Sequence, residues 1–239
     1  MRHFGIIGYP LQHSFSAKYF SEKFEREHID AEYSLYPLVL KAKKDEQLVE
    51  LIDRLDGMNV TMPYKQAVIP YLDRLDTTAE AVGAVNVICN RIGYNTDCLG
   101  FMASLQPLLR PFDKEALVLG TGGAAKAVVY GLNQLGIRPT LVSRTPKEGQ
   151  LSYEQLDKAL MESHTVLVNC TPLGMYPDVD ACPPIPYELI TPRHLLFDCV
   201  YNPEETLFLR HGKEQGAATR NGMEMLYGQA KAAWKIWNN

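Results

Sequence analysis

The clearest structural signal in this chain is the segment Ala116-Leu117-Val118-Leu119-Gly120-Thr121-Gly122-Gly123-Ala124-Ala125. Its four apolar residues predict a buried strand, and the glycine-rich turn leads into a helix expected over residues 124–135. The turn fits the pattern Gly-x-Gly-x-x-Gly/Ala, in which Gly120 permits the tight turn and Gly122 lets the backbone approach a pyrophosphate. N–H groups at the start of the helix favour anions. The context predicts a dinucleotide site, and an ordinary glycine-rich turn is the alternative interpretation.

Strands and helices are expected to alternate along the rest of the chain. In the second half, strands are expected at 140–142, 165–168 and 195–197, and helices at 153–161, 205–214 and from residue 222 onward. In the first half, strands are expected at 4–8, 33–38, 58–62 and 84–89, and helices around 17–24 and 48–55. Regular alternation predicts an α/β fold with a parallel sheet covered by helices on both faces. We place a domain boundary near residue 98.

Composition and charge exclude several classes of protein. Apolar residues make up 46% of the chain and charged residues 22%, which is typical of a folded globular protein. No run of about 18 uncharged apolar residues exists, so no membrane-spanning helix is expected. The net charge is −4 and there is no basic run, so nucleic acid is not an expected partner.

The metal-ligating residue types are not spaced as a metal site. The five cysteines show no Cys-x-x-Cys spacing, which indicates neither a zinc site nor a disulfide framework. The six histidines show no ligand spacing either. The N-terminal residues run into a short strand and not into the apolar segment of a signal peptide. These observations predict a cytoplasmic protein without a metal.

The end of the strand expected at 140–142 bears on which dinucleotide is bound. Enzymes that use NAD usually have an Asp or Glu there, which holds the ribose 2′-OH. This chain instead has Ser143-Arg144-Thr145-Pro146-Lys147. Arg144 carries a permanent charge and a fork of donors suited to a phosphate, which favours NADP. The alternative is that Arg144 and Lys147 are solvated loop charges, and Glu148 is the residue that argues against NADP.

Polar residues of the first half stand where a simple structural domain does not need them. Ser14 and Ser16 lie near an expected helix start, where two hydroxyls can hold a carboxylate, or where Ser16 is only an N-cap. Lys65 follows an expected strand and can act as an acid/base group, although a surface lysine is the commoner case. Asp97 at the domain boundary can orient Lys65 or simply cap the next helix.

Taken together and in order, these motifs resemble those of the shikimate dehydrogenase family along nearly the whole chain. Besides the glycine turn, the resemblance rests on Gly8-Tyr9-Pro10 with His13-Ser14-Phe15-Ser16, Asn59-Val60-Thr61 with Pro63 and Lys65, Gly83-Ala84-Val85-Asn86, Asn95-Thr96-Asp97, Asn169-Cys170-Thr171-Pro172-Leu173-Gly174-Met175, Asp198-Cys199-Val200-Tyr201-Asn202-Pro203 with Thr206, and Gly222 with Met225-Leu226 and Gln229. Eight ordered motifs are far more specific than the glycine turn alone.

The resemblance implies two domains with the active site in the cleft between them. Residues 1–97 with 222–239 would form an α/β substrate-binding domain, and residues 98–221 a Rossmann-type NADP-binding domain. The implied activity is the reversible NADPH-dependent reduction of 3-dehydroshikimate to shikimate, in the biosynthesis of chorismate and the aromatic amino acids. The implied partner is a small-molecule substrate, and the protein would be a monomer or a homodimer.

The resemblance also implies a role for each matching residue. Lys65 and Asp97 would form the catalytic pair, and Ser14 and Ser16 would bind the shikimate carboxylate. Other residues would line the substrate pocket, namely Thr61, Asn86, Tyr201 and Gln229. The pyrophosphate would be held by Gly120, Gly122, Gly123 and Ala124, and the adenosine 2′-phosphate by Ser143, Arg144, Thr145 and Lys147. The nicotinamide half would lie near Thr171, Cys199 and Gly222.

The chain departs from the family pattern mainly where the cofactor would bind. Ser143 stands where the family often has Asn, and Val87 where it often has Thr. A frequent arginine after the Asn-Arg-Thr motif is absent, and Lys147 and Glu148 occupy that region. Three alternatives therefore stay open: a quinate/shikimate dehydrogenase that uses NAD, a catalytically silent metabolite-binding protein on the same fold, and a folate-type dehydrogenase on a related architecture.

Overall fold

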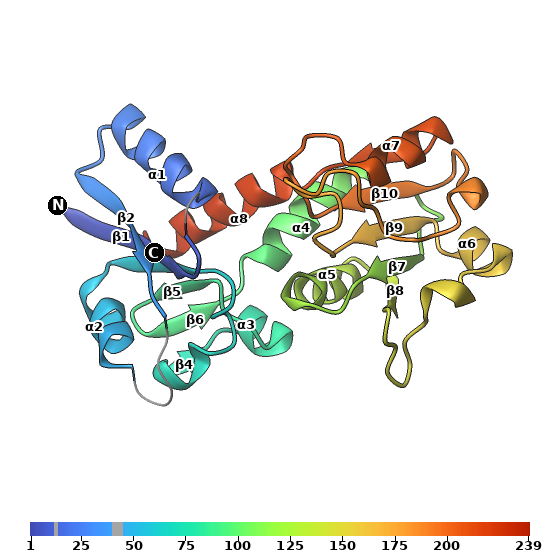
Figure 1. Cartoon of the computed structure of the whole chain (residues 1–239). Coiled ribbons are helices and arrows are strands. Elements are labelled where there is room, and N and C mark those ends of the chain that lie inside the picture. The colour runs from blue at the N-terminus through green and yellow to red at the C-terminus, as the bar shows by residue number, and fades with distance from the viewer. Residues whose placement is uncertain (12–13, 40–44) are drawn as a thin grey trace. The chain divides into compact units, whose positions relative to one another are not determined.

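The computed structural model of the chain describes residues 1–11, 14–39 and 45–239 (Figure 1). The chain forms two compact units: unit 1 is Met1–Thr96 with Gln229–Asn239, and unit 2 is Asp97–Gly228. The chain therefore passes between the units twice. It leaves unit 1 at the start of helix α4 (Asp97–Leu105) and returns inside the last helix, α8 (Met223–Ile236).

Unit 1 is built on a mixed sheet with the strand order β2-β1-β3-β5-β6-β4. The strands are β1 Arg2–Gly8, β2 Ala31–Pro37, β3 Gly57–Val60, β4 Arg74–Leu75, β5 Val87–Cys89 and β6 Ile92–Tyr94. Strand β1 pairs in parallel with β2 and β3, and β5 runs antiparallel to both β3 and β6. Five strands of the sheet, β1, β2, β3, β4 and β6, thus run in one direction, which brings their carboxyl ends to one edge.

Helices cover both faces of the unit 1 sheet. Helix α1 (Phe15–Arg26) and the end of α8 pack on one face, where Trp237 contacts both Phe4 of β1 and Phe20. Helix α2 (Glu46–Arg54) packs on the other face, against Ile7. Successive side chains of a strand point to opposite faces, so one short strand contributes to both cores. The short helix α3 (Thr77–Val82) follows β4.

Unit 2 carries a fully parallel sheet with the strand order β11-β10-β9-β7-β8. The strands are β7 Glu115–Leu119, β8 Arg138–Val142, β9 Val166–Asn169, β10 Leu195–Asp198 and β11 Ala218–Arg220. One face packs against α4, α5 (Gly123–Gln134) and the start of α8, and the other against α6 (Lys158–Ser163) and α7 (Leu207–Glu214). The α/β fold is confirmed, and so is the parallel sheet with helices on both faces in unit 2. The unit 1 sheet differs from this expectation, because β5 runs antiparallel to its two neighbours.

Several elements differ from the sequence-based expectation. The helix expected at 153–161 is a 3₁₀ turn at Tyr153–Gln155 followed by α6, because the side chain of Asp157 accepts from the Leu160 N–H and starts a new helix. Strand β11 was not expected; it is only three residues long, too short for a periodic signal. The strand expected at 84–89 begins only at Val87, although the Asn86 backbone still hydrogen-bonds Val60 and Tyr94.

The other short elements are 3₁₀ turns at Ile69–Tyr71, Gln106–Leu108 and Tyr187–Leu189. Across the part of the chain that the structure describes, no helix combines the length and apolar character needed to cross a membrane.

Candidate functional site

One edge of the unit 1 sheet collects most of the predicted substrate residues. Strands β1 and β3 are parallel, so the segments after Gly8 and after Val60 leave the sheet at the same edge. Strand β5 is antiparallel to β3, so Asn86 enters the sheet there, and β6 delivers Thr96 to the same edge. Backbone bonds from the Val60 N–H to the Asn86 carbonyl (2.9 Å) and from the Asn86 N–H to the Tyr94 carbonyl (3.0 Å) hold these segments together.

Asn86 lies at the centre of a buried hydrogen-bond network. Its Oδ1 accepts from the Thr96 N–H at 2.7 Å, and its Nδ2 donates to Thr96 Oγ1 at 3.0 Å. Nδ2 also lies 3.5 Å from Oε1 of Gln229, on helix α8. Asn86 and Gln229 are 3% and 7% exposed. Residues 143 positions apart are thus brought together, and this network explains why a C-terminal glutamine stands beside an N-terminal strand end.

The two serines occupy different positions in helix α1. Ser14 is the N-cap, because its Oγ accepts from the Ala17 N–H at 3.3 Å. The expectation that Ser16 caps the helix is therefore wrong: Ser16 is buried in the first turn and hydrogen-bonds Tyr33. The Tyr33 hydroxyl donates to Asn59 Oδ1 at 2.6 Å, and burial raises the pKa of Tyr33 well above its usual range. His13, part of the same motif, lies outside the described residues.

Lys65 and Thr61 lie in the turns that follow β3. The Tyr64 N–H donates to the Thr61 carbonyl at 2.9 Å, and the Lys65 carbonyl accepts from the Val85 N–H at 2.7 Å. The Lys65 side chain is half-buried. Asp97 is also half-buried and is the first residue of α4, directly after Thr96 of the Asn86 network. Lys65 belongs to unit 1 and Asp97 opens unit 2, so their pairing stays a prediction.

The glycine turn of unit 2 has the geometry that a dinucleotide requires. Gly120 has φ +105°, which a residue with a side chain rarely adopts. A Cβ at Gly122 or Gly123 would meet no atom within 4 Å, so the backbone at the start of the 12-residue helix α5 is open to a ligand. Ala125 is buried against the sheet, as the glycine pattern predicts. These residues fit a pyrophosphate at the helix N-terminus.

A pocket of about 350 Å³ opens beside this turn. Its polar lining comes from Thr121 and Lys126 of the turn and α5, and from Thr145, Lys147 and Gln150 of the loop after β8. Two lysines in one small pocket fit a phosphate. The sequence-based reasoning missed Lys126, although its place six residues after Gly120, on the first turn of the expected helix, was available as a signal.

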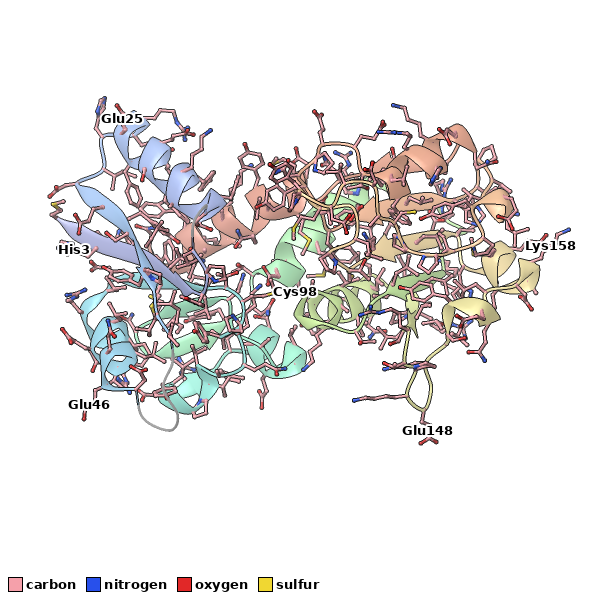
Figure 2. The ribbon with its side chains drawn as sticks, viewed as in Figure 1. His3, Glu25, Glu46, Cys98, Glu148 and Lys158 are labelled. Carbon is pink, nitrogen blue, oxygen red and sulfur yellow. The ribbon has the colours of Figure 1, made fainter. Side chains whose placement is uncertain are left out.

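The loop after β8 presents its charged residues differently. The Ser143 Oγ accepts from the Thr145 N–H at 3.2 Å, and Arg144 is exposed. Glu148, which argues against NADP, lies at the tip of the loop and points away from the sheet (Figure 2). The residues that line the pocket include Lys147 and not Glu148.

The carboxyl ends of β9 and β10 carry the residues predicted near the nicotinamide. The Asn169 Oδ1 accepts from Thr171 Oγ1 at 2.6 Å, and the Asn169 Nδ2 donates to Asp198 at 3.0 Å. A Cβ at Gly222 would lie 2.3 Å from the Cys199 carbonyl oxygen, so only glycine allows this approach. Tyr201, predicted to contact substrate, follows β10 in unit 2 and is 38% exposed.

Asp198 is the most strongly perturbed carboxyl group of this region. It is fully buried, and burial raises its pKa to about 6. Hydrogen bonds from Thr206 (2.5 Å), from the Val200 N–H (2.9 Å) and from Asn169 act in the opposite direction. Asp198 therefore ties together the loops that follow two neighbouring strands.

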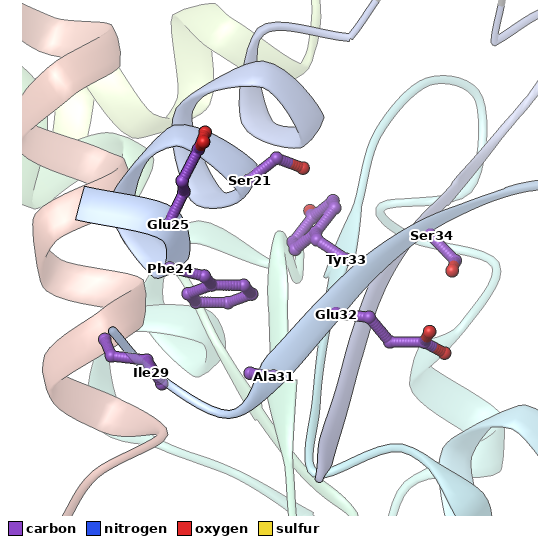
Figure 3. Close-up of a pocket in the computed structure, with 8 residues that line it drawn as sticks. All are labelled: Ser21, Phe24, Glu25, Ile29, Ala31, Glu32, Tyr33 and Ser34. Atoms are coloured by element: carbon purple, nitrogen blue, oxygen red, sulfur yellow. The ribbon is translucent and has the colours of Figure 1, made fainter. Parts of the chain in front are cut away.

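A second hollow, of about 450 Å³, lies beside the edge strand β2 (Figure 3). Its lining comes from α1 and β2 and includes Phe24, Glu25, Glu32 and Tyr33. None of the predicted substrate or cofactor residues is among the residues that line it. Over residues 1–11, 14–39 and 45–239, no three His, Cys, Asp or Glu side chains are grouped to hold a metal ion.

Comparisons with known proteins find shikimate dehydrogenases by sequence profile, by sequence identity and by structure. A sequence profile described as "Shikimate dehydrogenase substrate binding domain" matches residues 6–88. Curated relatives named "Shikimate dehydrogenase (NADP(+))" include one from Clostridium beijerinckii, 39% identical over 99% of this chain and 92% of the relative. Another, from Desulforamulus reducens, is 36% identical over 98% of this chain and 88% of the relative. The crystal structure of shikimate 5-dehydrogenase from Thermus thermophilus in complex with NADP(H) and shikimate superposes with a TM-score of 0.87 at 30% identity, covering 99% of this chain and 93% of that one.

Proposed function

The chain belongs to the shikimate dehydrogenase family, and we propose that it catalyses the reversible NADPH-dependent reduction of 3-dehydroshikimate to shikimate. This is an oxidoreductase step of aromatic amino acid biosynthesis, expected in the cytoplasm. The observation that carries the proposal is the phosphate-binding turn opening on a two-lysine pocket. That turn occurs in a chain matching NADP-named shikimate dehydrogenases over at least 98% of its length.

Unit 1 binds the substrate and unit 2 binds the cofactor in this proposal. The match of residues 6–88 to a substrate-binding-domain profile supports the first assignment. The open glycine turn and the parallel sheet of unit 2 support the second, because dinucleotides bind at the carboxyl ends of such strands.

Shikimate is a small carboxylic acid with several hydroxyl groups, and the polar edge of unit 1 matches that chemistry. Ser14 and Ser16 supply two hydroxyls for the carboxylate. The same edge offers hydroxyl and amide partners for the ring hydroxyls from Thr61, Asn86 and Gln229. Tyr201 of unit 2 supplies a further hydroxyl in this proposal. The Asn86 network is already formed through Thr96, so Asn86 is oriented before the substrate arrives.

The proton is handled by Lys65 and Asp97. When bound, NADPH supplies the hydride that reduces the carbonyl carbon. The Lys65 ammonium donates a proton to the carbonyl oxygen in reduction, and the neutral amine accepts it from the shikimate hydroxyl in oxidation. Asp97 orients Lys65. Positioned acid/base help of this kind is worth about 10² to 10⁴ in rate.

In this proposal, backbone N–H groups hold the pyrophosphate of the cofactor, and charged and polar side chains hold its 2′-phosphate. Gly120, Gly122, Gly123 and Ala124 bind the pyrophosphate, and the 2′-phosphate meets Ser143, Arg144, Thr145 and Lys147. We add Lys126 to this second group because it lines the same pocket as Lys147. Thr171, Cys199 and Gly222 lie at the nicotinamide half.

The test is an absorbance assay of the reduced cofactor. Purified protein is offered shikimate or quinate, each with NADP⁺ or NAD⁺. The expected result is turnover chiefly with shikimate and NADP⁺. Preference for quinate or for NAD⁺ would contradict the proposed substrate or cofactor, but it would still support the proposed hydride transfer. Cofactor binding without turnover on any pair would instead identify a silent metabolite-binding protein.

A further inference from the structure

Two of the five cysteines stand side by side at the carboxyl edge of the unit 2 sheet. Cys170 follows β9 and Cys199 follows β10, one residue beyond the aligned pair Asn169 and Asp198. Their Sγ atoms are 3.8 Å apart, and the Cys199 N–H donates to the Asn169 carbonyl at 2.9 Å. Neighbouring strands lie about 4.8 Å apart, which falls within the Cα separation of about 4.4 to 6.8 Å that a disulfide accepts.

The backbone on each side of this pair packs against a glycine assigned to the cofactor site. A Cβ at Gly120 would lie 3.4 Å from the Cys170 carbonyl, and one at Gly222 would lie 2.3 Å from that of Cys199. Both cysteine residues are partly exposed. A displacement of either cysteine is therefore transmitted directly to the phosphate turn or to the residue that precedes α8.

The other thiols are engaged elsewhere. The Cys89 thiol points to the Asp56 carbonyl at 3.8 Å, Cys182 hydrogen-bonds Tyr187, and Cys98 is fully buried in α4. Within residues 1–11, 14–39 and 45–239, Cys170 and Cys199 are the cysteines whose thiols contact each other.

We propose that Cys170 and Cys199 form a reversible dithiol/disulfide site whose oxidation weakens cofactor binding. The effect on the cofactor rests on the proposed function, whereas the cross-link itself does not. Closing the bond brings the sulfurs from 3.8 Å to about 2.05 Å. The strand ends that contact Gly120 and Gly222 must move with them, which disturbs the surface assigned to the nicotinamide half.

The oxidant is a small disulfide such as oxidised glutathione. The Cys199 thiolate attacks one of its sulfurs, forms a mixed disulfide and releases the first glutathione thiolate. The Cys170 thiol then loses its proton and attacks Cys199 Sγ, which releases the second glutathione. Two thiols and one glutathione disulfide thus give one protein disulfide and two glutathione thiols. Cys199 attacks first in this scheme because burial raises the pKa of Cys170 and holds it as the thiol.

The experiment combines thiol mapping with cofactor binding on the full chain. Reduced protein is equilibrated with oxidised glutathione, with and without NADP⁺, then alkylated and mapped by mass spectrometry. We expect the number of alkylated thiols to fall from five to three, with one peptide cross-link between Cys170 and Cys199. The oxidised protein should bind NADP⁺ about tenfold more weakly, and dithiothreitol should restore binding. Because NADP⁺ would then bind the dithiol form about tenfold more tightly than the disulfide form, saturating NADP⁺ should raise the reduction potential of the disulfide by about 30 mV.

Variants separate the possible outcomes. Cys170→Ala should accept one glutathione at Cys199 without a cross-link, and Cys199→Ala should form no cross-link either. Cys182→Ala, which changes a half-buried thiol outside the pair, should cross-link as the parent does. Five retained thiols, a cross-link between other cysteines, or a cross-link that leaves NADP⁺ affinity unchanged would each refute the proposal. Absence of turnover in the reduced protein would count only against the proposed function, because thiol mapping and NADP⁺ binding are measured without substrate.

Discussion

At the scale of single residues, Lys65 carries the sharpest prediction. Lys65→Ala should lower kcat by about 10² to 10⁴, because the proton would lose its positioned donor. NADP⁺ affinity should stay the same, because Lys65 lies in unit 1 after β3. Steady-state kinetics and cofactor titration measure the two effects. Lys158→Ala, which removes an exposed lysine of α6, is the matched control. A large loss of NADP⁺ affinity with kcat intact would contradict the assigned role.

The two pocket lysines make a second prediction at this scale. Lys126→Ala and Lys147→Ala should each weaken NADP⁺ binding about 5- to 30-fold, because each removes a charge-assisted bond to the 2′-phosphate worth about 1 to 2 kcal/mol. NAD⁺ binding should change little, because NAD⁺ lacks that phosphate. Titration of both dinucleotides gives the ratio. Glu148→Ala is the control on the same loop, and an equal loss for NAD⁺ and NADP⁺ in the lysine variants would rule out a 2′-phosphate contact.

At the scale of elements, Asp198 connects the loops after β9 and β10 and makes stability depend on pH. Its folded pKa of about 6 lies above the ordinary 3.8, so the folded state binds the proton more tightly. The stabilisation is complete below about pH 4 and is lost as pH rises through 6. A shift of about two units corresponds to about 3 kcal/mol.

Comparison with Asp198→Asn isolates this contribution. The free energy of unfolding of the parent, minus that of the variant, should fall by about 2 kcal/mol between pH 4 and pH 7. Other carboxyl groups also make stability depend on pH, such as Asp113, whose pKa is lowered beside Arg110 and Thr165. They are present in both proteins, so their contribution cancels when the two free energies are subtracted. Urea denaturation at several pH values provides the measurement. A difference that stays flat or rises with pH would show that the Asp198 proton is not bound more tightly in the folded state.

At the scale of the whole molecule, the C-terminal end of the chain packs against the N-terminal strand. Trp237 is 4% exposed, donates from Nε1 to the Ile88 carbonyl at 3.2 Å and packs on Phe4 at 4.9 Å between ring centroids. A Cβ at Gly57 would lie 2.4 Å from the Trp237 ring, so the contact leaves no space. The C-terminus thus completes the core of the N-terminal sheet.

Removing this side chain should be costly for unit 1. Trp237→Ala should lower the free energy of unfolding by about 3 to 5 kcal/mol, through lost burial and the cavity left behind. The half-buried Trp234, which lies beside Arg2 and Lys23, is the matched control, and Trp234→Ala should cost distinctly less. Chemical denaturation compares the two variants. Equal losses would show that the C-terminal helix is not anchored through Trp237.

The sequence by itself determined the features that depend on local chemistry. The turn at Gly120 and the alternating strands of unit 2 are encoded by neighbouring residues, because a positive φ needs glycine and buried parallel strands need apolar runs. The ordered motifs likewise placed the chain in its family. Tertiary structure decided what depends on distant partners. Ser14 and not Ser16 caps α1, the Asn86 Nδ2 lies near Gln229, Lys126 joins Lys147 in one pocket, and Cys170 meets Cys199. Spacing along the chain cannot encode such meetings, because packing between elements sets them.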